Sequence, residues 1–255
     1  MADKQKKKKK FPWGVIIWFL GCMVVGAVLG VILAENDVDM NADPFMILFI
    51  MIAFIGAIYI HVIFHEGGHL LAGLMTGYRF VSYRIGSFMW EKQKNGKIRF
   101  CRYSLAGTGG QCLMAPPEYN EGNFPYLLYN LGGGLMNLLL AGISGLLLML
   151  PVGDYMRIFL WAMIFVGVFT CVTNLLPLKK LNNDGSNIVE IGKSPAARKA
   201  FWLQMRVNEE TANGVRMKDM PEEWFERQDE NRKNVMVTSV DVMASSRLMD
   251  KMELE

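Results

Sequence analysis

The segment Phe45–His69 reads FMILFIMIAFIGAIYIHVIFHEGGH, an apolar run without charge that ends in a His-Glu-x-x-His motif. On a helix, this spacing places His65 and His69 one turn apart on one face, where both imidazoles can bind a single Zn²⁺. Glu66 then lies beside the remaining coordination position, where a carboxylate can take a proton from water. Ionisable groups at the end of such a run are costly unless they have a function. The segment therefore predicts a metal site at the end of a membrane-spanning helix.

All three histidines of the chain lie in this segment. At a rise of about 1.5 Å per residue, His61 and His69 are about 12 Å apart along the helix axis, whereas Zn–N bonds are only about 2.0–2.1 Å long. We therefore expect His61 to pack beside the site and the third ligand to come from elsewhere in the chain. A histidine pair with this spacing can also form a structural metal site or a hydrogen-bonded core pair.

The composition excludes an ordinary soluble domain. Of the 255 residues, 52% are hydrophobic, and the excess is concentrated in four segments that can each cross about 30 Å of hydrocarbon, which takes about 20 helical residues. The predicted spans cover residues 11–34, 45–75, 124–150 and 155–178. We therefore expect a multi-pass integral membrane protein, mainly α-helical, with four transmembrane helices.

The placement of charge predicts the orientation of these spans. Residues 1–10 are rich in lysine, Lys179 and Lys180 follow the fourth span, and the loop Glu35–Asp43 carries only acidic charges. The positive-inside rule places both termini and residues 78–123 in the cytoplasm, and we expect the membrane to be the cell membrane. The N-terminal lysine run should contact anionic lipid rather than nucleic acid.

Residues 79–105 predict a small membrane-associated β-hairpin. Phe80–Ile85 and Lys97–Tyr103 are rich in β-branched and aromatic residues, and Asn95-Gly96 between them is a strong turn signal. We therefore expect these two stretches to form the hairpin at the inner face of the membrane.

The glycine-rich segment Gly107–Gln111 follows the predicted hairpin. It lacks the lysine and the spacing of a phosphate-binding loop, so a nucleotide site is not expected there. We expect a flexible, polar turn that leads back into the membrane and could admit water.

The chain becomes polar after the fourth span, and we expect residues 191–255 to form a helical cytoplasmic tail. Ser194-Pro195 is typical of a helix start, Gly214 of a helix stop, and Pro221 of a further first turn. Two or three amphipathic helices fit this pattern.

Asp184 is the carboxylate best placed to be the third metal ligand. The twenty residues from Phe45 to His65 span about 30 Å of helix, which puts the histidine pair near the inner boundary of the bilayer. Asp184 follows the inward-running fourth span and should lie at the same depth. Glu190 is the nearby competitor, and an Asp-Gly pair is also typical of a simple turn after a helix. Two histidines and one carboxylate leave a fourth zinc position for water.

The order of these motifs resembles that of the site-2 protease family, which consists of intramembrane zinc metalloproteases. The resemblance covers about residues 45–190. It rests on the His-Glu-x-x-His motif, the hairpin after it, and two later motifs, namely Gly133-Gly134-Leu135-Met136-Asn137 and Asn174-x-x-Pro177 followed by Asp184-Gly185.

The resemblance implies a membrane metalloprotease domain at residues 11–190 with zinc as its cofactor. His65, His69 and Asp184 would bind the metal, and Glu66 would be the catalytic base. The resemblance also implies that Asn137 positions substrate or stabilises the tetrahedral oxyanion. We assign Asn174 to substrate binding as well.

The activity implied by the resemblance is hydrolysis of a peptide bond near the cytoplasmic face of a single-span membrane protein or a signal-peptide remnant. A helical substrate must become extended before attack, and pairing with a sheet edge would achieve that. The alternatives are a catalytically silent membrane adaptor or metal sensor that acts through its tail, and a transporter, for which the chain shows no paired repeat. Glu66 favours the enzyme, because a metal-binding scaffold does not need a base.

Overall fold

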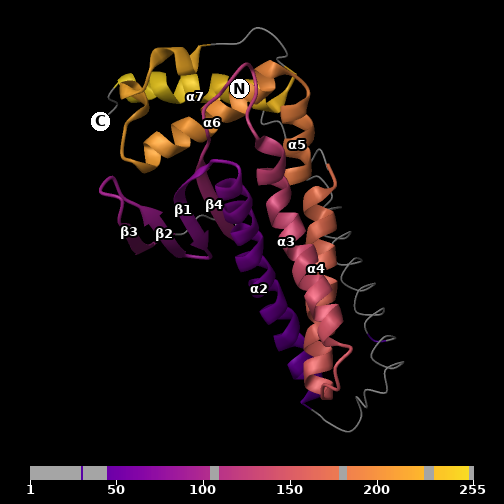
Figure 1. Cartoon of the computed structure of the whole chain (residues 1–255). Coiled ribbons are helices and arrows are strands. Elements are labelled where there is room, and N and C mark those ends of the chain that lie inside the picture. The colour runs from indigo at the N-terminus through magenta and orange to yellow at the C-terminus, as the bar shows by residue number, and fades with distance from the viewer. Residues whose placement is uncertain (1–29, 31–44, 104–108, 178–182, 227–232, 253–255) are drawn as a thin grey trace, which may run out of the picture.

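The computed structural model describes residue 30 and residues 45–103, 109–177, 183–226 and 233–252. In this part of the chain the protein is mainly helical, with a small antiparallel sheet beside one end of a helical bundle (Figure 1). Three of the described helices are long and apolar enough to cross a membrane, namely α2 (Met46–Met75), α3 (Tyr126–Leu147) and α4 (Asp154–Leu175). They correspond to three of the predicted spans. The other predicted span, residues 11–34, lies outside the described residues except for Gly30.

The three long helices bury small and polar side chains and expose large apolar ones. Ala57 and Ala162 are fully buried between α2 and α4, whereas Ile52 and Leu139 are each 56% exposed. Helices that pack in lipid use small residues at their contacts and turn apolar side chains outward. The distribution of side chains therefore fits a membrane-spanning bundle.

Two glycines allow α2 and α3 to pack closely. A β-carbon on Gly68 would lie 2.2 Å from the carbonyl oxygen of Gly132, and one on Gly132 would lie 2.4 Å from the carbonyl oxygen of Gly68. No side chain fits between these two backbones. Gly68 lies between Glu66 and His69, so this contact also holds the His-Glu-x-x-His segment against α3.

We expect Gly68→Ala to destabilise the protein by about 1–3 kcal/mol, because the added methyl group forces α2 and α3 apart. Gly67→Ala is the matched control, since a β-carbon on Gly67 meets no described atom within 4 Å. Alanine is a better helix former than glycine by about 1 kcal/mol, so the control should be neutral or slightly stabilising. Unfolding in detergent by titration with dodecyl sulfate measures both changes. Equal effects of the two substitutions would contradict this assignment.

The predicted hairpin is part of a larger antiparallel sheet, which corrects the expected pairing. The described sheet has four strands in the order β3-β2-β1-β4. Their bounds are β1 (Arg79–Ile85), β2 (Phe88–Lys92), β3 (Ile98–Arg102) and β4 (Gly110–Ala115). The Asn95-Gly96 turn joins β2 to β3 rather than β1 to β3, because the chain already reverses at Gly86, where φ is +57°.

Strand β4 corrects a second expectation, that of a flexible turn at Gly107–Gln111. Residues 104–108 lie outside the described part, but Gly110 and Gln111 begin β4 and pair with Ile85 and Arg84 of β1. Further along the strand, Cys112 and Met114 are buried against Tyr78 and Phe124. Burial of these alternating apolar side chains stabilises a strand whose glycine-rich start favours a turn when taken alone.

Three shorter helices follow the bundle and cover the end that lies next to the sheet (Figure 1). They are α5 (Asp184–Gly192), α6 (Pro195–Ala212) and α7 (Val235–Lys251). Ser194 caps α6 by accepting a hydrogen bond from the Ala197 N–H at 3.1 Å, and Gly214 adopts a φ of +76° after the helix ends. Both predicted helix signals are confirmed. Pro221 precedes a short 3₁₀ turn, Glu222–Phe225, rather than an α-helix.

The C-terminal helices are joined to the rest of the protein through the segment between β4 and α3. The indole N–H of Trp202 in α6 donates to the Pro117 carbonyl at 2.7 Å, and Arg198 donates to the Gly122 carbonyl at 3.1 Å. The helices share a core of their own that includes Ile191, Val207 and Val240. They therefore form a packed layer rather than an independent appendage.

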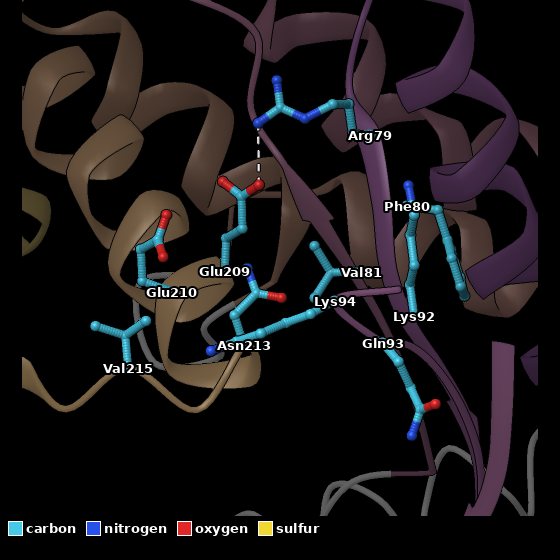
Figure 2. A pocket seen from close by; sticks show the side chains of 10 residues that line it. All are labelled: Arg79, Phe80, Val81, Lys92, Gln93, Lys94, Glu209, Glu210, Asn213 and Val215. Atoms are coloured by element: carbon cyan, nitrogen blue, oxygen red, sulfur yellow. Dashed lines mark hydrogen bonds and ion pairs between the residues drawn. The ribbon is translucent and has the colours of Figure 1, made fainter. Parts of the chain in front are cut away.

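A cavity of about 440 Å³ lies between β1, the turn after β2 and the end of α6 (Figure 2). Its walls carry charges of both signs, among them Lys92, Lys94 and Glu210. Arg79 of β1 and Glu209 of α6 form an ion pair between the two walls at 2.9 Å. The described lining contains none of the predicted site residues, which gather at a different place.

Candidate metal centre

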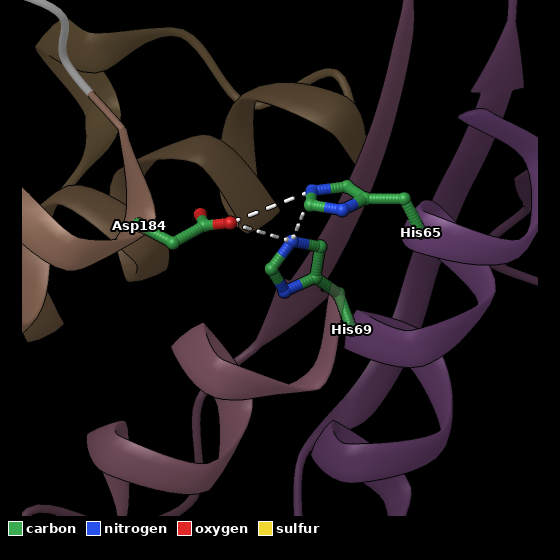
Figure 3. A group of neighbouring side chains, drawn as sticks. All are labelled: His65, His69 and Asp184. Atoms are coloured by element: carbon green, nitrogen blue, oxygen red, sulfur yellow. Dashed lines mark hydrogen bonds and ion pairs between the residues drawn. The ribbon is translucent and has the colours of Figure 1, made fainter. Parts of the chain in front are cut away.

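The two histidines of the motif point from α2 into the space between α3 and the start of α5 (Figure 3). His69 is 8% exposed, and His65 is partly buried. Their Nε2 atoms lie 3.2 Å apart. The predicted geometry of a one-turn pair is thus present, with both imidazoles directed at a common point.

Asp184 reaches this point because α5 starts directly against the end of α4. The Asn183 side chain accepts a hydrogen bond from the Ser186 N–H at 2.9 Å and so caps α5. Its amide also donates to the carbonyls of Thr173 and Leu176, at 2.7 and 2.6 Å. These bonds fix the first turn of α5, and with it Asp184, against the last turn of α4.

Gly185 is required at the same junction. A β-carbon on Gly185 would lie 2.1 Å from the Leu175 carbonyl oxygen. The Asp-Gly pair therefore acts as a close contact between α4 and α5 as well as a helix start. The alternative interpretation, that Asp184-Gly185 is a simple turn after a helix, is therefore wrong.

The three side chains form a triangle of the size that a zinc ion needs. Asp184 Oδ2 lies 3.4 Å from the Nε2 atoms of both His65 and His69. In a tetrahedral site with bonds of about 2.0–2.1 Å, ligand atoms lie about 3.3 Å apart. Asp184 Oδ2 is buried and has no hydrogen-bond partner within the described residues. A buried carboxylate oxygen without a partner needs an explanation. A cation held between this oxygen and the two imidazole nitrogens would provide one.

The electrostatic environment keeps Asp184 in the form that binds metal. Burial alone would raise the pKa of Asp184, but the facing His65 and His69 lower it to about 2. The carboxylate is therefore ionised at neutral pH, as a metal ligand must be.

A backbone carbonyl orients His69. Its Nδ1 donates a hydrogen bond to the Tyr129 carbonyl of α3 at 2.7 Å. Metal-binding histidines commonly donate their other ring nitrogen in this way, which leaves Nε2 with a lone pair for the metal. This contact could not be found from the sequence, because a carbonyl carries no residue-specific signal.

Gly133 forms the floor of the site, a role that sequence reasoning missed. A β-carbon at this position would lie 2.5 Å from His65 Cε1 and 2.6 Å from the Nε2 atoms of both His65 and His69. Any side chain here would occupy the space between the imidazoles. The run of three glycines at 132–134 inside an apolar span is the signal that could have pointed to such a contact.

Glu66 lies between the histidines in sequence and contacts the sheet. Its carboxylate interacts with the backbone N–H of Cys112 in β4, and it is close enough to His65, His69 and Asp184 for electrostatic interaction with each. A β-carbon on Gly110 would lie 2.7 Å from Glu66 Cγ. The glycine at the start of β4 thus leaves room for the glutamate beside the three candidate ligands.

The remaining candidates lie outside the triangle. His61 is fully buried against α3 and α4, as expected for a packing residue. Asn137 contacts His65 at 3.1 Å, and the Asn174 amide donates to the Thr170 carbonyl at 3.0 Å. Glu190, the competitor of Asp184, forms an ion pair with Lys193.

Comparison with protein families gives one result. Residues 53–155 match Peptidase family M50, the site-2 protease family. The predicted resemblance is confirmed by this match. Comparison with curated proteins and with solved structures found no match.

The M50 match covers less than half of the chain. It includes His65, Glu66, His69, Gly133 and Asn137, and it ends before Asp184. The family implies an intramembrane metalloprotease. In this chain, His65 and His69 meet a third candidate ligand, Asp184 of α5, which lies outside the matched region.

Proposed function

We propose that the protein is an intramembrane zinc endopeptidase, in which His65, His69 and Asp184 hold the metal and Glu66 is the catalytic base. The observation that carries this proposal is the triangle of ligand atoms at 3.2–3.4 Å beside a glutamate in the same helix turn. Three protein ligands leave a fourth coordination position for water, which hydrolysis requires.

The chemistry divides between the metal and Glu66. Zinc, when bound, lowers the pKa of a coordinated water and polarises the scissile carbonyl. Glu66 accepts the proton that the attacking water loses and returns a proton to the leaving amine. The Glu66 carboxylate also interacts with the Cys112 N–H and with both histidines, so it lies beside the candidate ligands.

We infer that the substrate is a single-span membrane protein or a signal-peptide remnant, bound as an extended strand. The strand order leaves β4 at an edge of the described sheet, and β4 is the strand that contacts Glu66. A segment paired with this edge would have its carbonyls released from helical hydrogen bonds next to the base. Asn174 remains a predicted substrate-binding residue.

The orientation proposed from the charge pattern places the site near the cytoplasmic face of the cell membrane, with both termini in the cytoplasm. The lysine run proposed to contact anionic lipid lies outside the described residues. The C-terminal helices, which cover the end of the bundle that carries the metal centre, would then lie on the cytoplasmic side.

Cleavage of a single-span model substrate by the purified full-length protein tests the proposal. We expect cleavage that a chelator stops and added Zn²⁺ restores, and about one zinc per protein by metal analysis. Asp184→Ala should lose zinc and activity together. Glu190→Ala, which removes the same charge from the same helix, should retain both, because Glu190 pairs with Lys193 instead. Chelator-resistant cleavage, or normal zinc content in Asp184→Ala, would contradict the proposed site.

A further inference from the structure

A line of buried polar groups runs from α4 to His65 and crosses the bundle. His61, which is 0% exposed, donates from Nε2 to the Met163 carbonyl of α4 at 2.8 Å. Its Nδ1 lies 3.2 Å from Asn137 Oδ1, and Asn137 Nδ2 lies 3.1 Å from His65 Nδ1. Asn137 itself is 1% exposed. Three groups from three helices are thus connected to His65, a candidate metal ligand.

The His61 end of this line is held rigidly. A β-carbon on Gly167 of α4 would lie 2.6 Å from His61 Cε1 and 2.9 Å from the Asn137 carbonyl oxygen. The glycine leaves a notch in α4 that the imidazole ring fills. The ring orientation, and hence the direction of both its nitrogens, is therefore determined by packing.

The hydrogen positions follow from the Met163 end. A carbonyl oxygen can only accept, so His61 Nε2 carries a hydrogen. A second hydrogen on the ring would make a buried cation inside a membrane-spanning bundle, which is costly. In the neutral ring His61 Nδ1 is an acceptor, and Asn137 must present its NH₂ group to it.

The orientation of the Asn137 amide also determines which ring nitrogen of His65 carries a hydrogen. In the structure the amide lies the other way round, with Oδ1 toward His61 and Nδ2 toward His65. The two ends of an amide have nearly the same shape, so a half-turn of the side chain gives the orientation that the Met163 contact requires and leaves both imidazoles in place. With its NH₂ group toward His61, Asn137 turns its carbonyl oxygen toward His65. His65 Nδ1 then carries the hydrogen, and His65 Nε2 keeps its lone pair, directed at Asp184 and His69.

We propose that Asn137 is a positioning residue that selects the metal-binding tautomer of His65, with His61 and the Met163 carbonyl holding the amide in place. This inference rests on the proposed zinc site. It gives His65 the same kind of support that the Tyr129 carbonyl gives His69. The two ends of the Asn137 amide contact His61 and His65 inside the protein. Asn137 therefore affects catalysis by orienting His65 and not by binding substrate.

Nitrogen NMR of the ¹⁵N-histidine-labelled, zinc-loaded protein tests the tautomers directly, because the chain contains only three histidines. We expect the His65 and His69 rings to be protonated at Nδ1 and the His61 ring at Nε2. Substitution of each histidine in turn assigns the signals. A His65 ring protonated at Nε2 in the zinc-loaded protein would overturn the inference.

Metal affinity gives a second readout, measured by Co²⁺ absorbance and by Zn²⁺ competition with a chelator. Asn137→Leu should weaken binding by about 10–100-fold, as is typical when a partner of a metal-binding histidine is removed. Asn137→Asp keeps an acceptor for His65 and should bind metal more tightly than Asn137→Leu. Ser144→Ala is the control, because this buried hydroxyl of the same helix bonds only to the Leu140 carbonyl among the described groups, and it should not change affinity.

The outcomes separate this inference from the proposed function. Unchanged metal affinity in Asn137→Leu, with a raised KM for the model substrate, would assign Asn137 to substrate binding and overturn the inference alone. Equal losses in Asn137→Asp and Asn137→Leu would also overturn it, because packing rather than the acceptor would then matter. An unaltered protein that binds neither Co²⁺ nor Zn²⁺ would overturn the proposed function, and the inference with it.

Discussion

Glu66→Gln should reduce cleavage of a membrane substrate by at least about 100-fold, the contribution expected of a general base, while zinc content and stability stay nearly unchanged. Glutamine has the same shape as glutamate, so it fits beside Gly110 and its carbonyl oxygen can still accept from the Cys112 N–H. What it lacks is the ability to accept a proton from water. Single-turnover cleavage and metal analysis of the same preparation measure the two effects separately.

The histidine variants complete this test. His65→Ala or His69→Ala should lose zinc as well as activity, since each removes one corner of the ligand triangle. A catalytically silent adaptor or metal sensor would tolerate Glu66→Gln in every assay. Cleavage at the normal rate by Glu66→Gln would show that the base is elsewhere and would remove the mechanism proposed for this site.

Gly133→Ala should abolish zinc binding and activity together, although the change adds only one methyl group. That group would lie 2.5–2.6 Å from the two imidazoles, whereas non-bonded atoms normally pack about 3.5–4.0 Å apart. Either the imidazoles or α3 must therefore move by about 1 Å, and a displacement of this size at a reacting centre can cost about 100-fold in rate. Zinc affinity by chelator competition and the rate of cleavage report the loss.

Gly142→Ala is the matched control on the same helix. A β-carbon on Gly142 meets no described atom within 4 Å, and the residue is exposed. The control should keep its zinc and its activity, because the substitution is the same and only the surroundings differ. If both variants lost zinc equally, a general effect of alanine on α3 would explain the result, and Gly133 would not form the floor of the site.

Much of the helical architecture was predictable because it depends on long uniform patterns. The predicted spans at 45–75, 124–150 and 155–178 differ from α2, α3 and α4 by only a few residues at each end. The start of α6 at Ser194-Pro195 was also predictable, because helix capping is a local interaction. In each case the decisive physics acts within one segment.

The sheet was predicted less well, because strand pairing is not local. The Asn95-Gly96 turn was recognised, but the partner of β3 is β2, and β1 pairs instead with β2 and β4. Strand β4 begins with glycine, which favours a turn when read alone. It becomes a strand because β1 offers it hydrogen bonds and because Cys112 and Met114 are buried beneath it.

Some features of the site could be predicted from the residues alone, namely two histidines one helical turn apart in a His-Glu-x-x-His motif, a glutamate next to the first of them, and a carboxylate at the matching depth of a later segment. Those features follow from helix geometry and bilayer thickness. Three other features became visible only in the folded chain: Asp184 rather than Glu190 meets the histidines, Gly133 leaves space between them, and Asn137 joins His61 to His65. These contacts join residues far apart in the chain, and their distances depend on how closely α2, α3, α4 and α5 pack.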